Sequence, residues 1–338
     1  MRSLTPRRIA WICVALAAIL FAIVVFSLEV GAFPISASDV VLTLVRGAIG
    51  HWNDIAPSDR LVVFGLRLPR IALGIQVGAA LSVSGASFQA LRRNPLADPY
   101  VLGVSSGAAL GAICSLAWFP HQPWTMQLLA FIGAFVTIAA VYFLGRRGGQ
   151  LDSTTLLLAG IVAASFLSAV IMFLMTTLSG RDLRGMAFWL MGDLATAPTV
   201  RLWFLFLLLL LALGAIYTTA SDLNLILTGE REAYHLGVNV PRVKLVVYVC
   251  ASLLTGVAVS VSGAIGYVGL LIPHVIRLLF GSDYRLLIPA SALGGAIAVT
   301  LADTLARTLF APTELPVGAM TAALGAPVFI YLLKRRFA

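Results

Sequence analysis

The chain has 338 residues, of which 60% are hydrophobic and 11% charged, and its mean hydropathy is +0.99. This composition excludes a soluble domain, whose surface must be charged. A net charge of +9 would suit nucleic-acid binding only if the basic residues formed a stripe on a soluble face, and here they are scattered between apolar runs. We therefore expect an integral membrane protein that does not bind nucleic acid and is embedded in a lipid bilayer.

Ten apolar runs are expected to cross the membrane as helices, since about 20 apolar residues span a hydrocarbon core of ~30 Å. In chain order they lie near 9–28, 63–83, 99–119, 124–145, 154–178, 200–220, 242–262, 268–280, 285–308 and 315–334. The loops between them are short and leave no room for a soluble catalytic domain. Residues 1–338 are thus expected to form one transmembrane permease domain of the all-α class.

The basic residues predict the orientation of these spans. An even number of spans places both termini on one side, and Arg7, Arg8, Arg335 and Arg336 lie at the two ends. Positive charge favours the cytoplasmic side. The first run is longer than the apolar part of an ordinary secretory signal, so it is expected to stay as a span. We expect a multi-pass protein of the cell (inner) membrane with both termini in the cytoplasm.

An internal repeat predicts the architecture. The segment Gly78–Ala86 returns as Gly256–Ala264, with the last five residues identical. The two copies lie at the ends of spans two and seven, which cross in opposite directions, so the match indicates an inverted repeat of five plus five helices. Small residues recur often in such a composition, and chance remains the alternative.

Glycines at helical spacing predict where helices approach one another closely. Gly74 and Gly78, and then Gly103, Gly107 and Gly111, form patterns in which small residues recur every four positions. Such patterns let helix backbones come close together. We expect these glycines to pack helices rather than to bind a substrate.

Motifs for ATP binding and for catalysis are missing from the sequence. The two lysines, Lys244 and Lys334, do not follow a glycine as a P-loop lysine must. The histidines and cysteines are too dispersed for a metal cluster, and neither a nucleophile elbow nor a His-Glu-x-x-His helix is present. The chain is expected to be a transport subunit and not an enzyme, with no metal or cofactor of its own.

One acidic residue, Asp303, lies well within a predicted span. Ionisable groups inside the bilayer are the proton or sodium sites of ion-coupled carriers, so an ion-coupled secondary transporter is one alternative. Arg307 follows one helical turn later, at the spacing that brings side chains together. A structural ion pair is the favoured interpretation, and energy is then expected to come from another subunit.

Six ordered motifs between residues 60 and 334 carry a family resemblance. They are Arg67-Leu68-Pro69-Arg70; Arg93-Asn94-Pro95-Leu96-Ala97; Leu102-Gly103 with Ser106-Gly107-Ala108; Ile265 to Leu270 with Ile272-Pro273-His274; Ala302-Asp303 with Ala306-Arg307; and Glu314 to Gly318. The chain resembles the permease subunits of ABC importers for iron–siderophores, haem and vitamin B12. Asn94, Pro95, Pro273, His274 and Asp303 belong to the structural motifs of that family.

The resemblance implies the partners and the cargo. Such permeases are homodimers of ten-helix subunits, receive cargo from a periplasmic or surface binding protein, and are driven by two ATPase subunits in the cytoplasm that bind ATP and magnesium. The function implied is import of an iron chelate. An iron–siderophore is the favoured cargo, and haem and vitamin B12 remain alternatives because their permeases share every motif.

The resemblance also assigns roles to residues at the outer face. Arginines at positions matching Arg67, Arg70 and Arg307 meet glutamates on the binding protein, and Arg–carboxylate pairs suit reversible docking. Snorkelling of these side chains to the interface is the alternative. We expect these three arginines to form the docking site.

Two cytoplasmic segments are expected to complete the machinery. In 221–242, short helices with Glu230, Ala233 and Leu236, ended by Gly237, are expected to dock on the ATPase, and a solvated loop is the alternative. The stretch with Asp152, Ser153 and Thr154 matches the inner gate of related permeases. Asp152 departs from an uncharged gate and is also placed to cap the fifth span.

Overall fold

The structure is a computed structural model that describes residues 5–31, 33, 35–119, 122–147, 150–151, 153–178, 183–195, 201–311 and 313–337. Ten helices coincide with the ten predicted runs. They are α1 (Pro6–Glu29), α4 (Leu68–Leu91), α5 (Val104–Trp118), α6 (Pro123–Leu144), α7 (Ser153–Thr177), α9 (Leu202–Thr218), α12 (Val240–Ser262), α13 (Val268–Phe280), α14 (Tyr284–Thr308) and α15 (Val317–Phe337). The prediction of an all-α membrane fold is confirmed.

Not every predicted run is a full-length span. Within the described chain, six helices are long and apolar enough to cross a membrane, or seven if α9 and α10 (Ala220–Thr228), which meet at 47°, form one bent span. Helices α5 and α13 are short because a segment that is not α-helical precedes each of them. The 3₁₀ turn η3 (Pro99–Leu102) ends at Gly103 with φ +74°, and Tyr267, with φ +67°, precedes α13.

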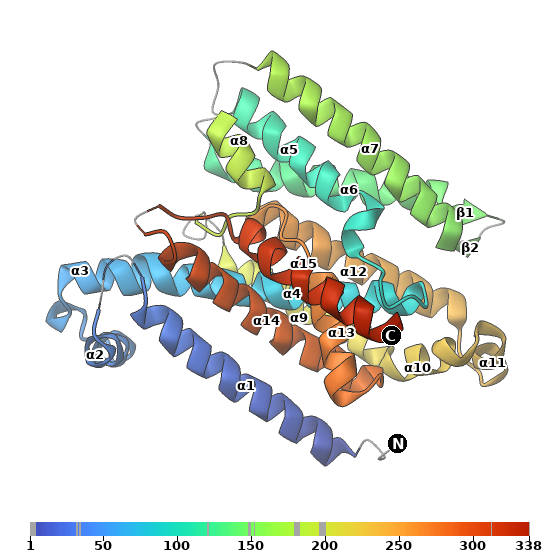
Figure 1. The fold of residues 1–338 in the computed structure, drawn as a ribbon, viewed down its shortest axis with the longest axis horizontal. Helices are drawn as coiled ribbons and strands as arrows, with labels where there is room; N and C mark the ends of the chain where they lie inside the picture. The colour runs from blue at the N-terminus through green and yellow to red at the C-terminus, as the bar shows by residue number, and fades with distance from the viewer. Residues whose placement is uncertain are drawn as a thin grey trace.

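Several short elements complete the chain. They are α2 (Ala37–Ala48), the 3₁₀ turn η1 (Trp52–Asp54), α3 (Pro57–Arg60), the π-helical stretch η2 (Leu61–Arg67), α8 (Leu183–Leu190), α11 (Glu230–His235), and an antiparallel pair of strands, β1 (Arg146–Arg147) and β2 (Gln150–Leu151). Sequence reasoning missed α2 and α8. In Figure 1, α2 is seen end-on, so it runs across the direction of the long helices.

The long helices run roughly side by side, and the two chain ends lie at the same end of the bundle. In Figure 1 both termini, α10, α11 and the β1–β2 turn lie toward the right, whereas α2, α3 and α8 lie toward the left. Helices α5 to α8 form one group, and α1, α4, α9 and α12 to α15 form the other. The right-hand end is called the terminal end below, and the left-hand end the opposite end.

The packing of the helices follows the five-plus-five repeat. In a repeat of five plus five spans, α4 corresponds to α12, α5 to α13, and α6 to α14. The pair α4–α14 therefore corresponds to the pair α12–α6, and the pair α5–α6 corresponds to α13–α14. All four pairs pack in the structure, as do the exchanged pairs α5–α7 and α13–α15, and α5–α12 and α13–α4. Helices α4 and α12, which carry the sequence repeat, run in opposite directions (Figure 1). The inverted repeat predicted from the sequence is therefore present.

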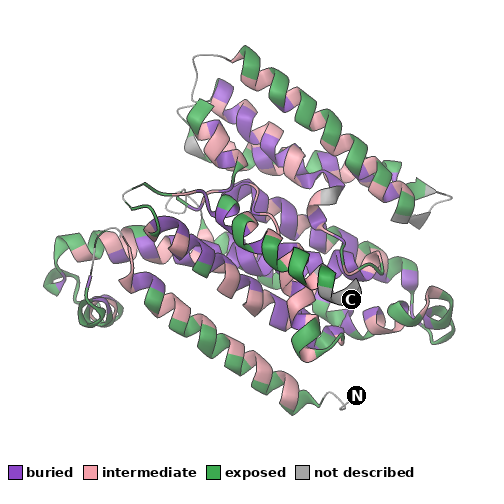
Figure 2. Cartoon of the chain, in the orientation of Figure 1, coloured by how far each residue is buried: buried purple, intermediate pink, exposed green. Residues whose placement is uncertain are grey.

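Helix α4 lies at the centre of the protein and is mostly buried, whereas α1 and α7 are largely exposed (Figure 2). Glycines let its neighbours reach its backbone. A Cβ at Gly78 would clash with the carbonyl of Gly295 on α14, and a Cβ at Gly85 would clash with the carbonyl of Gly269 on α13. On α5, Gly107 approaches Gly133 of α6 in the same way. These contacts confirm the predicted packing role for Gly78 and Gly107.

Pro273 explains part of the close approach at Gly85. A proline has no N–H, so the carbonyl four residues earlier, that of Gly269, loses its helical donor. That same carbonyl faces Gly85. The side-chain amide of Gln89, one turn further along α4, donates to the carbonyl of Leu270 at 3.1 Å. The proline in α13 and the glycine in α4 thus contribute to one interface.

Gly85→Ala is expected to destabilise the protein by about 2–3 kcal/mol, because the new methyl group would force α4 and α13 apart. The measurement is the thermal midpoint of the purified protein in detergent. Gly214→Ala is the matched control, since no atom lies within 4 Å of a Cβ there and alanine suits a helix interior better than glycine. Equal midpoints for the two variants would contradict this packing.

Candidate functional site

A cluster of buried charges joins α4 to α14 near the opposite end of the bundle. The Nε of Arg70 lies 2.9 and 3.1 Å from the two carboxylate oxygens of Asp303. The Nε of Arg307 lies 3.2 Å from Asp303, and Nη1 of Arg70 lies 2.7 Å from Glu314. The predicted pair between Asp303 and Arg307 is confirmed. Arg70 is a second partner of Asp303, and it comes from a helix distant in sequence.

Arg67 has a different set of partners. Its buried guanidinium donates hydrogen bonds to the carbonyl oxygens of Leu28, Glu29 and Phe33. The last carbonyls of a helix lack intrahelical donors, and a cation is favoured beside them. Arg67 therefore caps the end of α1 and attaches the segment after it to the start of α4.

The structure brings the three predicted docking arginines to one end of the bundle, but each guanidinium is engaged within the chain. Arg67, Arg70 and Arg307 are all buried. Glu314, in contrast, leaves 49% of its side chain exposed. A partner carboxylate would have to compete with Asp303, Glu314 or backbone carbonyls for these arginines. The docking role stays a prediction.

The predicted coupling segment forms two short helices, α10 and α11, at the terminal end. Glu230 begins α11, and its carboxylate lies 3.0 Å from Arg93 and 2.7 Å from Lys244. The segment is therefore braced against α12 and against the turn after α4. Gly237, with φ +87°, follows α11 as expected for a residue that ends a helix.

The exposed apolar surface of this segment differs from the predicted one. Ala233 is fully buried in the chain's own core, so its expected contact with a partner is wrong. The side chains that face outward are Leu236, 66% exposed, and Tyr234, 70% exposed. Sequence reasoning missed Tyr234. The signal was available, because Tyr234 is a large aromatic residue in a short segment of mixed charge.

The Asn94-Pro95 block forms a fixed turn, as its composition predicts. Arg93 adopts φ +47°, and Oδ1 of Asn94 accepts a hydrogen bond from the amide of Leu96 at 2.9 Å. Further on, the hydroxyl of Tyr100 donates to the carbonyl of Ile265 at 3.0 Å. The bond from Tyr100 connects η3 to the segment before α13. His274 lies half-buried one residue after Pro273 on α13.

Only part of the predicted gate lies within the described residues. Asp152 is outside them, so neither a gating nor a capping role can be compared with the structure. Ser153 begins α7, and Thr154 is exposed on its first turn. The gate stays a prediction.

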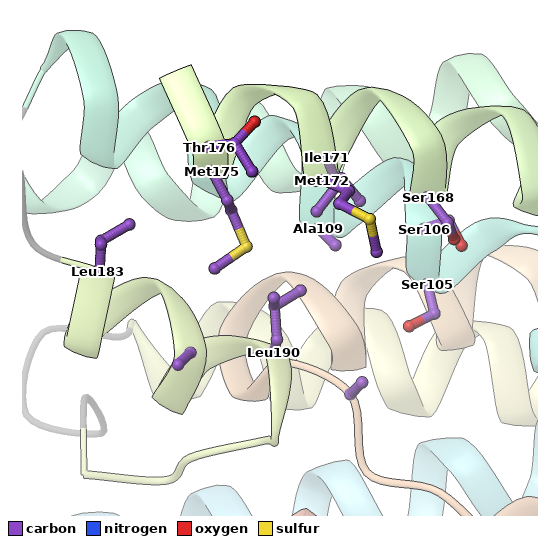
Figure 3. Close-up of a pocket in the computed structure, with 12 residues that line it drawn as sticks. Ser105, Ser106, Ala109, Ser168, Ile171, Met172, Met175, Thr176, Leu183 and Leu190 are labelled. Carbon is purple, nitrogen blue, oxygen red and sulfur yellow. The ribbon is translucent and has the colours of Figure 1, made fainter. Parts of the chain in front are cut away.

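A cavity of about 730 Å³ lies between α5, α7 and α8. Figure 3 shows its side chains: hydroxyl groups of serine and threonine stand beside the thioethers of Met172 and Met175. All its lining residues are uncharged. They are Ser105, Ser106, Ala109, Ser168, Ile171, Met172, Met175, Thr176, Leu183, Ala187, Leu190 and Ala264. Such a surface can accommodate a large molecule without holding it by charge.

A metal site is not formed by this part of the chain. Among the described residues, no three histidine, cysteine, aspartate or glutamate side chains come together as metal ligands. Cys13, Cys114 and Cys250 are free thiols on three different helices.

The model of the FecCD transport family matches residues 18–335. The chain belongs to the FecCD transport family. It is 45% identical over 299 residues to an uncharacterised ABC transporter permease, YvrB of Bacillus subtilis, covering 86% of this chain and 82% of the relative. It is 42% identical to the cobalamin import permease BtuC of Halobacterium salinarum, over 83% of this chain and 75% of the relative.

Two further comparisons support the same placement. The hemin transport permease HmuU of Yersinia pestis is 40% identical, over 92% of this chain and 91% of that protein. A solved structure of a metal-chelate type ABC transporter in an inward-facing conformation has a TM-score of 0.82 and 31% identity, covering 96% of this chain and 99% of that one. The chain is thus a multi-pass membrane permease of the ABC importer class.

Arg67→Ala is expected to lower the free energy of unfolding by about 1–3 kcal/mol, because it removes the donors to buried carbonyls at the end of α1. The thermal midpoint in detergent measures this loss. Arg60→Ala is the control, since Arg60 lies in the same segment but is exposed above the ring of Trp52. If Arg67 served docking alone, both variants would match the parent protein.

The stability of the fold is expected to depend on pH through Asp283, which lies between α13 and α14. Arg285 lowers the pKa of this carboxyl to about 2, and a hydrogen bond from Asn224 of α10 acts in the same direction. A lowered folded-state pKa stabilises the fold above the ordinary aspartate pKa, by about 1 kcal/mol because solvent screens the half-exposed Arg285. That stability is lost as the pH falls from about 4 toward 2.

Asp283→Asn is therefore expected to lower the thermal midpoint at pH 6 and to lower it less at pH 3, where part of the stabilisation is already lost. Thermal melts of the parent and the variant at the two pH values measure the difference. Asp59→Asn is the control, because Asp59 is half-buried on α3 and its carboxylate accepts a hydrogen bond from the neutral hydroxyl of Ser58. A difference between parent and Asp283→Asn that is independent of pH would contradict the assignment.

Proposed function

We propose that this chain is the permease subunit of an ATP-driven importer that takes up an iron chelate, with an iron–siderophore as the favoured cargo. The observation that carries the proposal is the α10–α11 segment. It exposes Tyr234 and Leu236 and is braced by Glu230 through Arg93 and Lys244. Exposed apolar side chains on a segment held by ion pairs suit a contact through which the motion of another subunit reaches the helix bundle.

The partners follow from this role. Two copies of the chain would form the pathway, with two ATPase subunits that bind ATP and magnesium docked on α10 and α11. The terminal end would face the cytoplasm of a cell with this permease in its inner membrane, in agreement with the basic residues there. A periplasmic or surface binding protein would dock at the opposite end, where Arg67, Arg70 and Arg307 lie.

Docking at that end is proposed to proceed by exchange of carboxylates. Glu314 is half-exposed and pairs with Arg70 at 2.7 Å, so a glutamate of the binding protein could take its place. Asp303 would remain with Arg307 and keep the buried charges paired. On the cytoplasmic side, Ser153 and Thr154, with Asp152, are proposed to close the inner mouth of the pathway.

The uncharged cavity beside α7 supports a bulky cargo that is released without a tight binding step. Haem and cobalamin are the alternatives to an iron–siderophore, and the relatives named for hemin and cobalamin import support them. An ion-coupled carrier is a minor alternative. It would need Asp303 to bind and release a cation, and two guanidinium groups already neutralise this carboxylate.

The cargo can be identified by uptake measurements in a strain that lacks this gene and other chelate importers. The strain would be complemented with the gene and supplied with radiolabelled ferric siderophores, haem or cyanocobalamin. Rescue of ferric siderophore uptake is the expected result. Rescue of haem or cyanocobalamin alone would select that alternative, and no rescue of any of the three would contradict chelate import.

Replacing both Tyr234 and Leu236 by aspartate is expected to reduce uptake at least tenfold, because the loss of two buried anchors at an interface typically costs more than about 2 kcal/mol. The protein should still fold and reach the membrane, since both side chains are exposed in the chain. Ser221→Asp, at an exposed position on α10, is the control. Copurification of the ATPase with each variant measures docking directly, and full copurification with the double variant would contradict the coupling role.

A further inference from the structure

Two apolar grooves lie end to end on the surface of the bundle along α6 and α12. The first, of about 430 Å³, also involves α9, and the second has a volume of about 370 Å³. Phe131 of α6 and Leu253 of α12 line both, so the grooves meet at these residues. The floor is fixed by Tyr248 of α12, whose hydroxyl donates to the carbonyl of Ile138 on α6 at 3.2 Å.

The grooves exist because α1 and α9, which correspond to each other in the two halves of the repeat, pack differently. The pair α1–α14 in one half corresponds to the pair α9–α6 in the other. Helix α1 packs along α14, but α9 packs on α12 and α4 and scarcely touches α6. Its buried stripe, Leu205, Leu209, Ala212 and Ile216, faces the core of the bundle. The space that α1 fills in one half is thus open in the other.

The length of this open space matches a membrane. From Trp124 at one end to Phe143 at the other, a helix rises about 28 Å, close to the ~30 Å of the hydrocarbon core. Most of the lining is leucine, valine, isoleucine, phenylalanine and other apolar or aromatic residues, with few polar side chains among them. Water finds few hydrogen-bond partners in such a groove, whereas an extended hydrocarbon chain buries apolar surface there favourably.

A positive charge lies at one end of the first groove. Arg201 lines it and is exposed, and no residue within the described ranges is paired with its guanidinium. Trp124 and Trp203, 62% and 67% exposed, stand at the same end of α6 and α9, where tryptophan typically marks the boundary between hydrocarbon and head groups. The groove therefore runs from a cation at the level of the head groups into the apolar layer.

We propose that this groove is a binding site for one phospholipid. Its phosphate pairs with Arg201, since a guanidinium suits a phosphate group, and one acyl chain lies along α6 and α12 past Phe131. The lipid takes the place that α1 occupies in the other half of the repeat. It thereby closes the gap between α6 and α9.

A photoactivatable phosphatidylglycerol, with the reactive group on its acyl chain, tests the proposal in the purified protein reconstituted in nanodiscs. Adducts are expected on residues 128–143 of α6 and 245–257 of α12, along which the acyl chain lies. Arg201→Gln should lower the adduct yield at these peptides about fivefold, the effect of one basic residue on an anionic lipid. Arg184→Gln, at an exposed arginine of α8, should leave it unchanged.

Val257→Trp places a bulky ring in the groove and is expected to abolish the adducts there, whereas Ile132→Trp, on the exposed side of α6 outside both grooves, should not. Equal labelling of all outward-facing helices, unaffected by Val257→Trp, would overturn the proposal. Crosslinks of the groove residues to a second copy of this chain in place of lipid would overturn it as well.

Discussion

A carboxylate buried between two guanidinium groups fixes one end of this bundle. In a low-dielectric interior an unpaired charge is very costly, so Asp303 of α14 requires Arg70 of α4 and Arg307 to stay beside it. Arg67, one turn before Arg70, holds the end of α1. Three long helices, α1, α4 and α14, are therefore held in register by one short segment of chain, and the glycine contacts of α4 form in that register.

The inverted repeat explains most of the remaining helix packing and also shows where that packing departs from symmetry. Helices α4 and α12 occupy matching places, and most helix pairs obey the exchange of the two halves. The exceptions coincide with two proposed surfaces. Helix α9 bends into α10 and leads to the exposed α11 at the terminal end, and the same displacement of α9 leaves the groove beside α6. One departure from symmetry thus accounts for a proposed partner surface and a proposed lipid site.

Much of this arrangement was predictable from the sequence. Apolar runs predicted the helices, a local spacing predicted the pair between Asp303 and Arg307, and Gly237 predicted the end of α11, because each depends on residues close in the chain. The pairing of Arg70 with Asp303 was not predictable in this way, since it arises from packing between helices far apart in sequence. For the same reason the inward direction of Ala233, the exposure of Tyr234 and the transverse α2 needed the structure.

Asp303 is paired with two arginines in the fold, and the energy for transport is proposed to come from ATP hydrolysis on partner subunits. The most direct measurement is uptake into proteoliposomes that contain the permease with its ATPase and binding protein. The account predicts uptake with ATP supplied to the ATPase and no ion gradient, and none with a proton gradient in the absence of ATP. Uptake driven by the gradient alone, and lost in Asp303→Asn while the complex remains assembled, would contradict it.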